Sequence, residues 1–337
     1  MPRLDQHCRL SVAPMMDWTD RHCRRFHRQF TRHALLYTEM VTAAGVVKGD
    51  ADWLYRHDEA EHPLALQLGG SEPETLAEAV RRALPFGFAE INLNVGCPSD
   101  RVQSGAFGAC LMRAPGLVAD CTTAMIEAAG TGCGAPEITV KCRIGVDEQD
   151  PTEVLPAFLD TVAGSGVTRF AIHARKAWLE GLSPKENRSV PPLDYPLVYA
   201  MKRRRPDLSI SLNGGVTSLA EARMHLAHVD GVMIGRAAYG DPAGILGGAD
   251  AVIMGEAHTP IRAEDAVRGL YPYIEAELSA GTKLHQITRH MLGAFNGRPG
   301  ARAWRRVLSD GAHRPGAGIA LIERALSEIS PAVQAAE

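Results

Sequence analysis

The chain has 337 residues, 45% of them apolar, and carries 36 lysines and arginines against 39 aspartates and glutamates. This composition excludes a disordered or collagen-like protein, and the length suits one large α/β barrel with an appended segment. The formal net charge of −3 provides no overall attraction to nucleic acid or to an anionic membrane, so bulk charge alone argues against an RNA partner.

The amino terminus and the cysteines give no sign of export. The opening sequence MPRLDQHCRL lacks the apolar stretch of a signal peptide, and no run of about 18 uncharged apolar residues predicts a membrane span. Seven scattered cysteines without a C-x-x-C pair predict reduced thiols rather than a zinc or iron–sulfur site. We therefore expect a cytoplasmic protein without a metal centre.

Short apolar, β-branched segments recur along the first 234 residues, and amphipathic stretches such as 73–84, 115–129, 152–163 and 219–227 lie between them. Strands that alternate with helices predict right-handed βαβ units and a parallel sheet. Eight such units predict a (β/α)8 TIM barrel, with a doubly wound sheet as the alternative. The expected strands are Leu10–Met15, Leu35–Thr38, Leu64–Leu68, Glu90–Asn94, Ile138–Lys141, Phe170–His173, Ile210–Leu212 and Gly231–Ile234.

The pattern changes after the eighth expected strand. Residues 241–260 are rich in Gly, Ala and Pro and are typical of a connector, although 249–254 could continue a last barrel helix. From residue 261 onward only helical periodicity is present, with one apolar stripe over 284–295 and another over 319–326. We expect a catalytic barrel over residues 1–245 and a small all-helical domain over residues 255–337.

The carboxyl ends of the expected strands are polar. In a TIM barrel these ends converge on one mouth, where active sites lie. Seven polar ends are difficult to explain by packing alone, because polar groups that enter a barrel need partners. They comprise Pro14-Met15-Met16, Gln67, Asn94 to Cys97, Lys141, His173 to Arg175, Asn213-Gly214-Gly215 and Gly235-Arg236.

The last two of these ends, N-G-G and G-R, stand where such barrels commonly bind phosphate. Glycines let the backbone approach a ligand closely, and Arg236 adds a positively charged fork. The alternative is a pair of glycine turns that simply close the barrel. We favour phosphate binding, and hence a phosphorylated cofactor.

The remaining ends suggest which cofactor it is. Gln67 and Asn94 can donate to and accept from the edge of a planar heterocycle, and Lys141 can neutralise an anion formed when that ring is reduced. Met15 and Met16 offer a soft apolar floor for a flat ring. This set favours FMN over a resident NAD, so a pyridine nucleotide would act only as a transient reductant.

Cys97 lies in N-L-N-V-G-C-P-S, just past the fourth expected strand. A free thiol releases its proton near ambient pH, which makes it a suitable general acid opposite a hydride donor. The alternatives are a small buried apolar residue and a nucleophile, but no activating base adjoins it in the sequence. We expect Cys97 to be the catalytic acid.

Positive charge is concentrated near the carboxyl terminus. The segment 283–314 holds seven lysines and arginines against one aspartate, a local balance of +6. On a helix, Arg302, Arg305 and Arg306 share one face and Trp304 lies on the opposite face. An arginine ridge anchored by an apolar back suits contact with a phosphate backbone, so the local charge favours the RNA partner that the bulk charge did not.

Several strings together resemble the tRNA-dihydrouridine synthases, above all the bacterial A-type subfamily: A-P-M-M-D-W-T-D, N-L-N-V-G-C-P-S-D-R-V, T-V-K-C-R-I-G, I-H-A-R, L-S-P-K-E-N-R, L-N-G-G and I-G-R. The resemblance runs from about Ser11 to beyond Arg306. It implies an FMN-containing TIM barrel with a helical tRNA-binding domain, and a reduction of the C5–C6 double bond of uridine at positions 20 and 20a of the tRNA D-loop. NADPH would reduce the flavin, which would then pass hydride to C6.

The resemblance also implies roles for individual residues. Cys97 would protonate C5 of the uracil. The implied FMN contacts are Pro14, Met15, Met16, Gln67, Lys141, His173, Asn213, Gly214, Gly215, Gly235 and Arg236. The implied tRNA contacts are Asn94, which matches an asparagine near the uracil, and Lys185, Arg188, Arg302 and Arg305.

Two rival functions remain to be weighed. An FMN-dependent barrel could act on a free pyrimidine or another small molecule, but the basic segment 283–314 argues against it. An RNA-binding protein could have lost catalysis, but intact Cys97, Lys141 and His173 argue against that. We expect the clusters 21–32 and 202–205 to be solvated faces and the protein to be a monomer.

Overall fold

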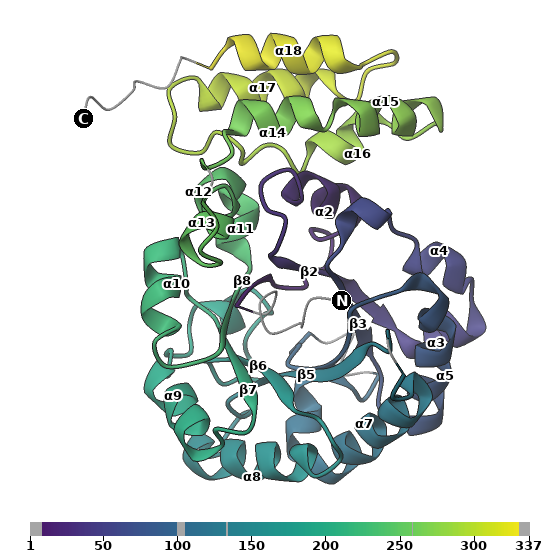
Figure 1. Ribbon diagram of the computed structural model, residues 1–337, viewed down its shortest axis with the longest axis vertical. Coiled ribbons are helices and arrows are strands. Elements are labelled where there is room, and N and C mark those ends of the chain that lie inside the picture. Colours follow the sequence, from purple (N-terminus) through teal and green to yellow (C-terminus); the bar gives the residue numbers. More distant parts are fainter. Residues whose placement is uncertain (1–8, 100–104, 133, 258, 330–337) are drawn as a thin grey trace.

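The computed structural model describes residues 9–99, 105–132, 134–257 and 259–329. Eight parallel strands follow one another around a closed barrel, and the first pairs with the eighth (Figure 1). This closure confirms the TIM barrel and excludes the doubly wound sheet. The strands are β1 Leu10–Val12, β2 Leu35–Thr42, β3 Leu64–Gly69, β4 Glu90–Val95, β5 Glu137–Arg143, β6 Arg169–His173, β7 Ser209–Asn213 and β8 Gly231–Ile234.

The strand bounds differ from expectation mainly in the first two strands. β1 ends at Val12, because Pro14 has no backbone N–H to donate to a sheet. β2 runs four residues beyond Thr38, and its register against β3 shifts between Tyr37 and Met40. That irregularity carries the strand past the mouth-facing carboxylate of Glu39.

Helices cover the outside of the barrel (Figure 1). Polar side chains cap several of them: Asp150, Asp194 and Ser218 each accept a hydrogen bond from a backbone N–H of the first turn. These helices are α2 Arg21–His27, α3 Ala43–Lys48, α4 Ala51–Tyr55, α5 Pro73–Ala83, α7 Pro115–Ala129, α8 Pro151–Ala163, α9 Tyr195–Arg204, α10 Leu219–His225, α11 Arg236–Gly240, α12 Pro242–Leu246 and α13 Ala249–Val252. The expected connector over 241–260 thus contains two short helices.

The carboxyl-terminal segment is helical and forms a layer at one side of the barrel (Figure 1). It comprises α14 Ala263–Gly269, α15 Tyr271–Ser279, α16 Leu284–Thr288, α17 Ala301–Gly311 and α18 Ile319–Ser327. The stripe over 284–295 is buried at Leu284, Ile287, Met291 and Phe295, but α16 ends at Thr288 and turns follow as far as Gly300. Among the described residues, no helix is long and apolar enough to cross a bilayer.

The helical layer is joined to the barrel by polar contacts as well as by a shared apolar core. Asp20, at the start of α2, accepts hydrogen bonds from Arg289 at 2.5 Å and from His290 at 3.0 Å. His22 on α2 lies 2.7 Å from the hydroxyl of Tyr273 on α15. The division into separate domains at residues 245 and 255 therefore stays a prediction.

Candidate active site

Cys97 lies at the carboxyl end of β4, where its backbone is held from both sides. The side-chain oxygen of Asn94 accepts hydrogen bonds from the backbone N–H groups of Gly96 and Cys97, each at 3.0 Å. The Cys97 carbonyl accepts from Ala109 at 2.9 Å, and the Cys97 sulfur lies 3.4 Å from the Ser99 hydroxyl. The half-buried thiol is thereby held at the barrel mouth, as expected. Residues 100–104 of the same loop lie outside the described residues.

Positively charged side chains surround this thiol, and Cys97 contributes to the electrostatic environment of Lys141, Arg143 and Arg188. Burial, followed by the charge of Arg143, lowers the pKa of Lys141 to about 8. Burial, followed by the charges of Arg188 and Arg175, lowers the pKa of Arg143 to about 10. The Cys97 sulfur therefore lies in a positively charged part of the mouth.

We define the mouth cations as Lys141, Arg143, Arg175, Arg188 and Arg236. Within the described part of the chain none of them forms an ion pair. Several of them donate hydrogen bonds to backbone carbonyls: Arg143 binds that of Gly96 at 3.0 Å, and Arg236 binds that of Arg188 at 3.1 Å. Among the described residues no carboxylate pairs with these positive charges, an arrangement that is typical of an anion-binding site.

His173 lies among these cations at the end of β6. Burial, followed by the charges of Arg143 and Lys141, holds its pKa well below the usual 6.5, so the imidazole is neutral. Its Nδ1 atom is buried and has no hydrogen-bond partner among the residues that the structure describes. A buried polar atom without a partner is rare in proteins, and here it is available to a ligand.

The glycines after β7 adopt backbone conformations that other residues avoid. Gly214 has φ of 110° and Gly215 has φ of 78°. A Cβ atom on Gly214 would lie 3.1 Å from His173, and one on Gly215 would lie 2.5 Å from the Tyr195 hydroxyl. Gly214 thus keeps the backbone close to the imidazole and Gly215 keeps it close to Tyr195, as a phosphate cradle requires.

The loop after β1 lies beside the turn after β8. Met15 is half-buried near Gly235, where an added Cβ would lie 3.4 Å from the Met15 sulfur. Pro14 is also half-buried, whereas Met16 is exposed. The structure thus brings the first and last predicted cofactor contacts to one place.

Two predicted cofactor contacts form hydrogen bonds within the protein. Gln67 is buried; its amide nitrogen donates to Asn92 and its amide oxygen accepts from Asn94, both at 2.8 Å. Asn213 donates to the Met233 carbonyl at 2.7 Å. Each amide retains a further hydrogen or lone pair for a ligand, so their cofactor roles stay predictions.

The predicted tRNA contacts fall on two surfaces. Lys185 and Arg188 are exposed on a short segment whose centre, Asn187, is buried and accepts from the backbone of Trp178 at 2.7 Å. Arg302 and Arg305 are exposed on α17. These two arginines line a cavity of about 390 Å³ together with residues 297–301.

The cluster 21–32 differs from expectation. We define the α2 cations as Arg21, Arg24, Arg25, Arg28 and Arg32. Arg24 is buried and donates to Glu61 at 2.6 Å, and the Arg28 guanidinium donates to four backbone carbonyls. The other three pair with Glu277, Asp58 and Glu256. These arginines hold α2 in place, so the expected solvated face is wrong there, whereas the 202–205 cluster forms surface ion pairs with Asp160, Asp207 and Asp230.

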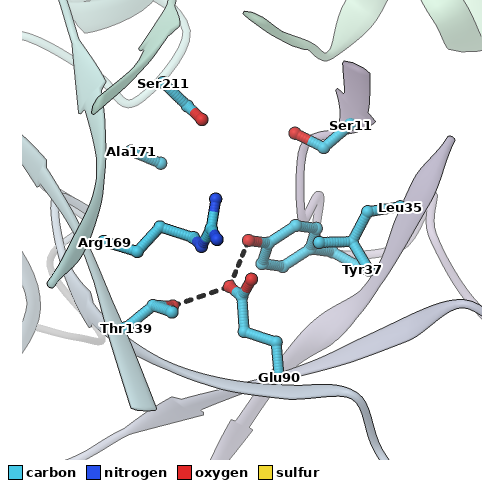
Figure 2. A pocket seen from close by; sticks show the side chains of 8 residues that line it. All are labelled: Ser11, Leu35, Tyr37, Glu90, Thr139, Arg169, Ala171 and Ser211. Atoms are coloured by element: carbon cyan, nitrogen blue, oxygen red, sulfur yellow. Dashed lines mark hydrogen bonds between the residues drawn. The ribbon is translucent and has the colours of Figure 1, made fainter. Parts of the chain in front are cut away.

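A small cavity lies inside the barrel, near the amino-terminal ends of its strands, and is lined by the polar groups of Tyr37, Glu90, Thr139 and Arg169 (Figure 2). Its volume of about 10 Å³ is too small for a cofactor or a base. Burial raises the pKa of Glu90 to about 7. The barrel interior around this cavity therefore offers no room for a cofactor or a base, and the mouth stays the predicted site.

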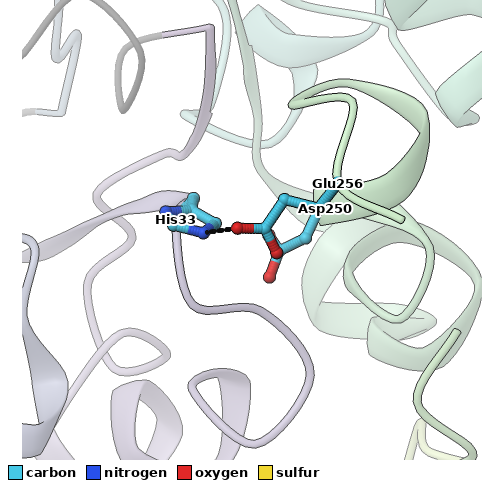
Figure 3. A group of neighbouring side chains, drawn as sticks. All are labelled: His33, Asp250 and Glu256. Atoms are coloured by element: carbon cyan, nitrogen blue, oxygen red, sulfur yellow. Dashed lines mark hydrogen bonds and ion pairs between the residues drawn. The ribbon is translucent and has the colours of Figure 1, made fainter. Parts of the chain in front are cut away.

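A histidine and two carboxylates lie together on the approach to β2, at the opposite end from the mouth (Figure 3). Their ligand-type atoms lie within 4.8 Å of one another. Glu256 binds Arg32 and His33, each at 2.5 Å, and Asp250 accepts from the Arg32 backbone at 2.7 Å. These contacts make the group an ion-paired link between the β2 approach and α13.

Arg143 is the clearest functional candidate that the sequence did not predict. Besides Gly96 it binds the carbonyls of Lys176 at 3.1 Å and Asn187 at 2.9 Å, so it ties the Cys97 loop to the 185–188 segment. Arg143 stands two positions after Lys141 on β5, and alternate residues of a strand point to the same face. This spacing is the feature of the sequence from which Arg143 could have been predicted to lie beside Lys141.

The mouth fits a phosphorylated flavin on several counts. It offers positive charge, the backbone of Gly214 close to His173, and an Nδ1 atom of that histidine without a partner among the described residues. Met15 supplies an apolar surface near Gly235. These features suit an anionic, planar cofactor.

Comparison with known proteins agrees with this chemistry. A family model described as dihydrouridine synthase matches residues 11–330. A tRNA-dihydrouridine(20/20a) synthase from Yersinia pestis is 57% identical over 324 residues, which cover 96% of this chain and 92% of that protein. One from Vibrio cholerae is 56% identical over 324 residues, covering 96% and 97%. A solved old yellow enzyme homologue from Zymomonas mobilis has a TM-score of 0.49 and 14% identity, and covers 77% of this chain and 92% of that chain.

Proposed function

The chain belongs to the dihydrouridine synthase family, and we propose that it is a tRNA-dihydrouridine(20/20a) synthase. It reduces the C5–C6 double bond of uridine at positions 20 and 20a in the D-loop of tRNA. The observation that carries the mechanism is the Cys97 thiol held at the mouth near Lys141 and Arg143, the same cations whose charges act on the neutral His173. Because its substrate is tRNA, the proposed place of action is the cytoplasm. The proposed oligomeric state is a monomer.

FMN is the cofactor that the mouth suits best. Gly214, Gly215, Gly235, Arg236 and His173 would hold its phosphate. Pro14, Met15, Met16, Gln67, Lys141 and Asn213 would surround its ring system. When bound, the flavin supplies the reducing equivalents, with NADPH as the transient reductant.

The chain itself supplies the proton. Reduction across C5–C6 needs a proton at C5, and Cys97 is the thiol held at the mouth for that transfer. The positive charges of Lys141, Arg143 and Arg188 stabilise the thiolate that remains. Asn94 holds the Cys97 backbone and lies where it can contact the uracil.

The substrate must reach the mouth as an unstacked base, since a duplex or stacked loop cannot enter a barrel. Lys185 and Arg188 are exposed beside the mouth, and Arg302 and Arg305 are exposed on α17. Their charges suit the tRNA backbone on either side of the extruded uridine. A free pyrimidine would need neither surface.

The first prediction concerns Cys97→Ala. Loss of the proton donor should lower dihydrouridine formation on an unmodified tRNA transcript at least 100-fold, the lower end of general acid catalysis. Flavin content, read from the visible spectrum, should be unchanged. Full turnover by the variant would remove Cys97 from the mechanism.

The control is Cys110→Ala, which changes a second half-buried thiol whose sulfur donates to the Phe107 carbonyl. It should retain full activity. Faster reoxidation of reduced protein by free uridine than by tRNA would instead support the small-molecule alternative.

A further inference from the structure

A continuous chain of hydrogen bonds runs through the barrel interior to the Cys97 loop. The Cys97 backbone N–H donates to Asn94 at 3.0 Å, and Asn94 donates to Gln67 at 2.8 Å. Gln67 donates to Asn92 at 2.8 Å, and Asn92 donates to the Thr139 hydroxyl at 2.7 Å. Thr139 then donates to the carboxylate of Glu90 at 2.6 Å (Figure 2). Five successive bonds thus join a mouth residue to a buried carboxylate.

The strand register explains why the chain is continuous. Gln67 pairs with Asn92 across β3 and β4, and Asn92 pairs with Thr139 across β4 and β5. Glu90 and Asn94 share the inner face of β4 with Asn92, because alternate residues of a strand point to the same side. The apolar residues between them, Ile91, Leu93 and Val95, are fully buried in the main apolar core.

Every donor in the chain points the same way, toward Glu90. A carboxylate only accepts hydrogen bonds, so Glu90 makes Thr139 a donor, which leaves the Thr139 oxygen as the acceptor for the Asn92 amide nitrogen. The amide oxygen of Asn92 is then turned to Gln67, and that of Gln67 to Asn94. The Asn94 oxygen is left facing the backbone of Gly96 and Cys97.

We infer that Glu90 is a positioning residue for the proposed reaction: as the terminal acceptor of this chain, it orients the amides that hold the Cys97 loop. The inference rests on the proposed role of Cys97. Glu90 touches no substrate and acts only through Asn92, Gln67 and Asn94. Its effect should therefore be seen at Cys97 without any change in tRNA binding.

The surroundings of Glu90 let its charge be varied by pH. It faces Tyr37 on β2, Glu137 on β5 and Arg169 on β6. Burial raises its pKa to about 7, and the hydrogen bonds of Thr139 and Tyr37 lower it in turn. A charged acceptor forms a stronger hydrogen bond than a neutral one, so the chain is strongest above this pKa.

The test compares Glu90→Met, which keeps the shape but removes the acceptor, with Glu90→Gln, which keeps one acceptor oxygen. In Glu90→Met, kcat on a tRNA transcript should fall about 3- to 10-fold with KM for tRNA unchanged, the effect of one lost hydrogen bond. Alkylation of Cys97 by iodoacetamide, followed on its peptide by mass spectrometry, should speed up by a similar factor. Glu90→Gln should lose less, and its kcat should lack the fall below about pH 7 that the raised pKa of Glu90 predicts for the natural protein.

Two further variants separate positioning from simple packing. Asn92→Leu breaks the same chain, so Glu90→Met with Asn92→Leu should be no worse than the more affected single variant. Tyr37→Phe removes another donor to Glu90 and leaves the chain intact, so it should keep the full kcat above the pKa and shift the inflection to higher pH.

Additive effects of Glu90→Met and Asn92→Leu would overturn the inference. So would a Glu90→Gln variant with an unchanged pH profile, which remains measurable if Glu90→Met folds poorly. Alkylation is measured on the protein without tRNA, so it does not depend on turnover. If Glu90→Met changes the alkylation rate but the natural protein does not reduce tRNA, the proposed function is contradicted and the hydrogen-bond chain is not.

Discussion

The mouth cations and the α2 cations are chemically alike but have opposite surroundings. Four of the five α2 cations pair with a carboxylate, and the fifth binds four backbone carbonyls. Within the described residues the mouth cations have no ionic partner, and burial, together with neighbouring positive charges, lowers the pKa values of Lys141, Arg143, Arg175 and Arg188. Arginines that a fold has neutralised contribute to its stability, whereas those left unneutralised mark where it binds an anion.

The largest expected effect is on stability, from Arg24→Met. This substitution leaves the buried carboxylate of Glu61 without its cation and should lower the free energy of unfolding by about 3–5 kcal/mol. Urea denaturation measures it. The matched control is Arg32→Met, whose ion pair is largely exposed and should contribute at most about 1 kcal/mol. Equal losses in the two variants would erase the distinction between buried and exposed α2 cations.

Lys141→Met should lower activity and leave stability unchanged, in contrast to Arg24→Met, which should lower stability. Turnover should fall about 100- to 1000-fold, the effect of removing one electrostatic stabiliser from a site. The flavin-free protein should lose no stability, because removing one mouth cation relieves both burial of charge and repulsion from Arg143. The control, Lys202→Met, breaks a surface pair with Asp230 and should leave turnover unchanged. A destabilised Lys141→Met protein would show that the mouth charge is structural.

The buried carboxylates of Glu61 and Glu90 also differ in their partners. Glu61 pairs with the Arg24 guanidinium, whereas Glu90 accepts hydrogen bonds from two hydroxyl groups. Its pKa rises from 4.5 in the unfolded chain to about 7 in the folded protein. A raised carboxyl pKa stabilises the fold fully below about pH 4.5, and this contribution is lost as pH rises through about 7. Relative to the natural protein, Glu90→Gln should therefore gain ~3 kcal/mol between pH 4.5 and pH 8. A difference that stays constant with pH would contradict the raised pKa.

The smallest expected effect is that of Arg302→Ala on α17. Loss of one phosphate contact should weaken tRNA binding about 5- to 10-fold at low salt and reduce the slope of log affinity against log salt by about 1. Flavin content should not change. The control is Arg268→Ala on α14, because that guanidinium is already bound to Glu323 at 3.0 Å. Equal salt slopes for Arg302→Ala and the natural protein would show that Arg302 is not part of the RNA-binding surface.

The barrel could be predicted from the sequence because each strand carries its own signal. The bounds of β8 and α7 agree with expectation, and the other strands differ by a few residues at their ends. The polar strand ends also predicted the gathering of Cys97, Lys141 and His173 at one mouth. Barrel geometry alone brings such ends together, so no long-range pairing had to be known.

Which arginines form ion pairs could not be predicted, because their carboxylate partners are distant in the sequence. Arg24 pairs with Glu61, 37 residues away, and Arg21 pairs with Glu277, 256 residues away. Part of the +6 charge of the 283–314 segment is likewise neutralised, because Arg289 binds Asp20 and Arg298 binds Glu264. Local composition shows how many charges a segment has, but only the fold shows which of them remain free.

The series of hydrogen bonds from Cys97 to Glu90 could be predicted from the sequence only in part. The alternation in E-I-N-L-N over 90–94 and in E-I-T-V-K over 137–141 places polar residues at every second position of two neighbouring strands. That pattern indicated a polar inner face. The direction of the hydrogen bonds depends on the register of β3, β4 and β5, which no single segment specifies.

The bonds between Asp20 and the residues after α16 limit how this protein could be recombined with its relatives. Asp20 follows directly on the mouth loop, while Arg289 and His290 begin the turns that lead to α17. Tyr239, at the end of the α11 turn after β8, also contacts His290 at 3.1 Å. A chimera that exchanges only the helical layer would break this junction and disturb the mouth loop at the same time. The helical layer and the start of the barrel would therefore have to be exchanged together, although more than 260 residues separate Asp20 from Arg289 in the chain.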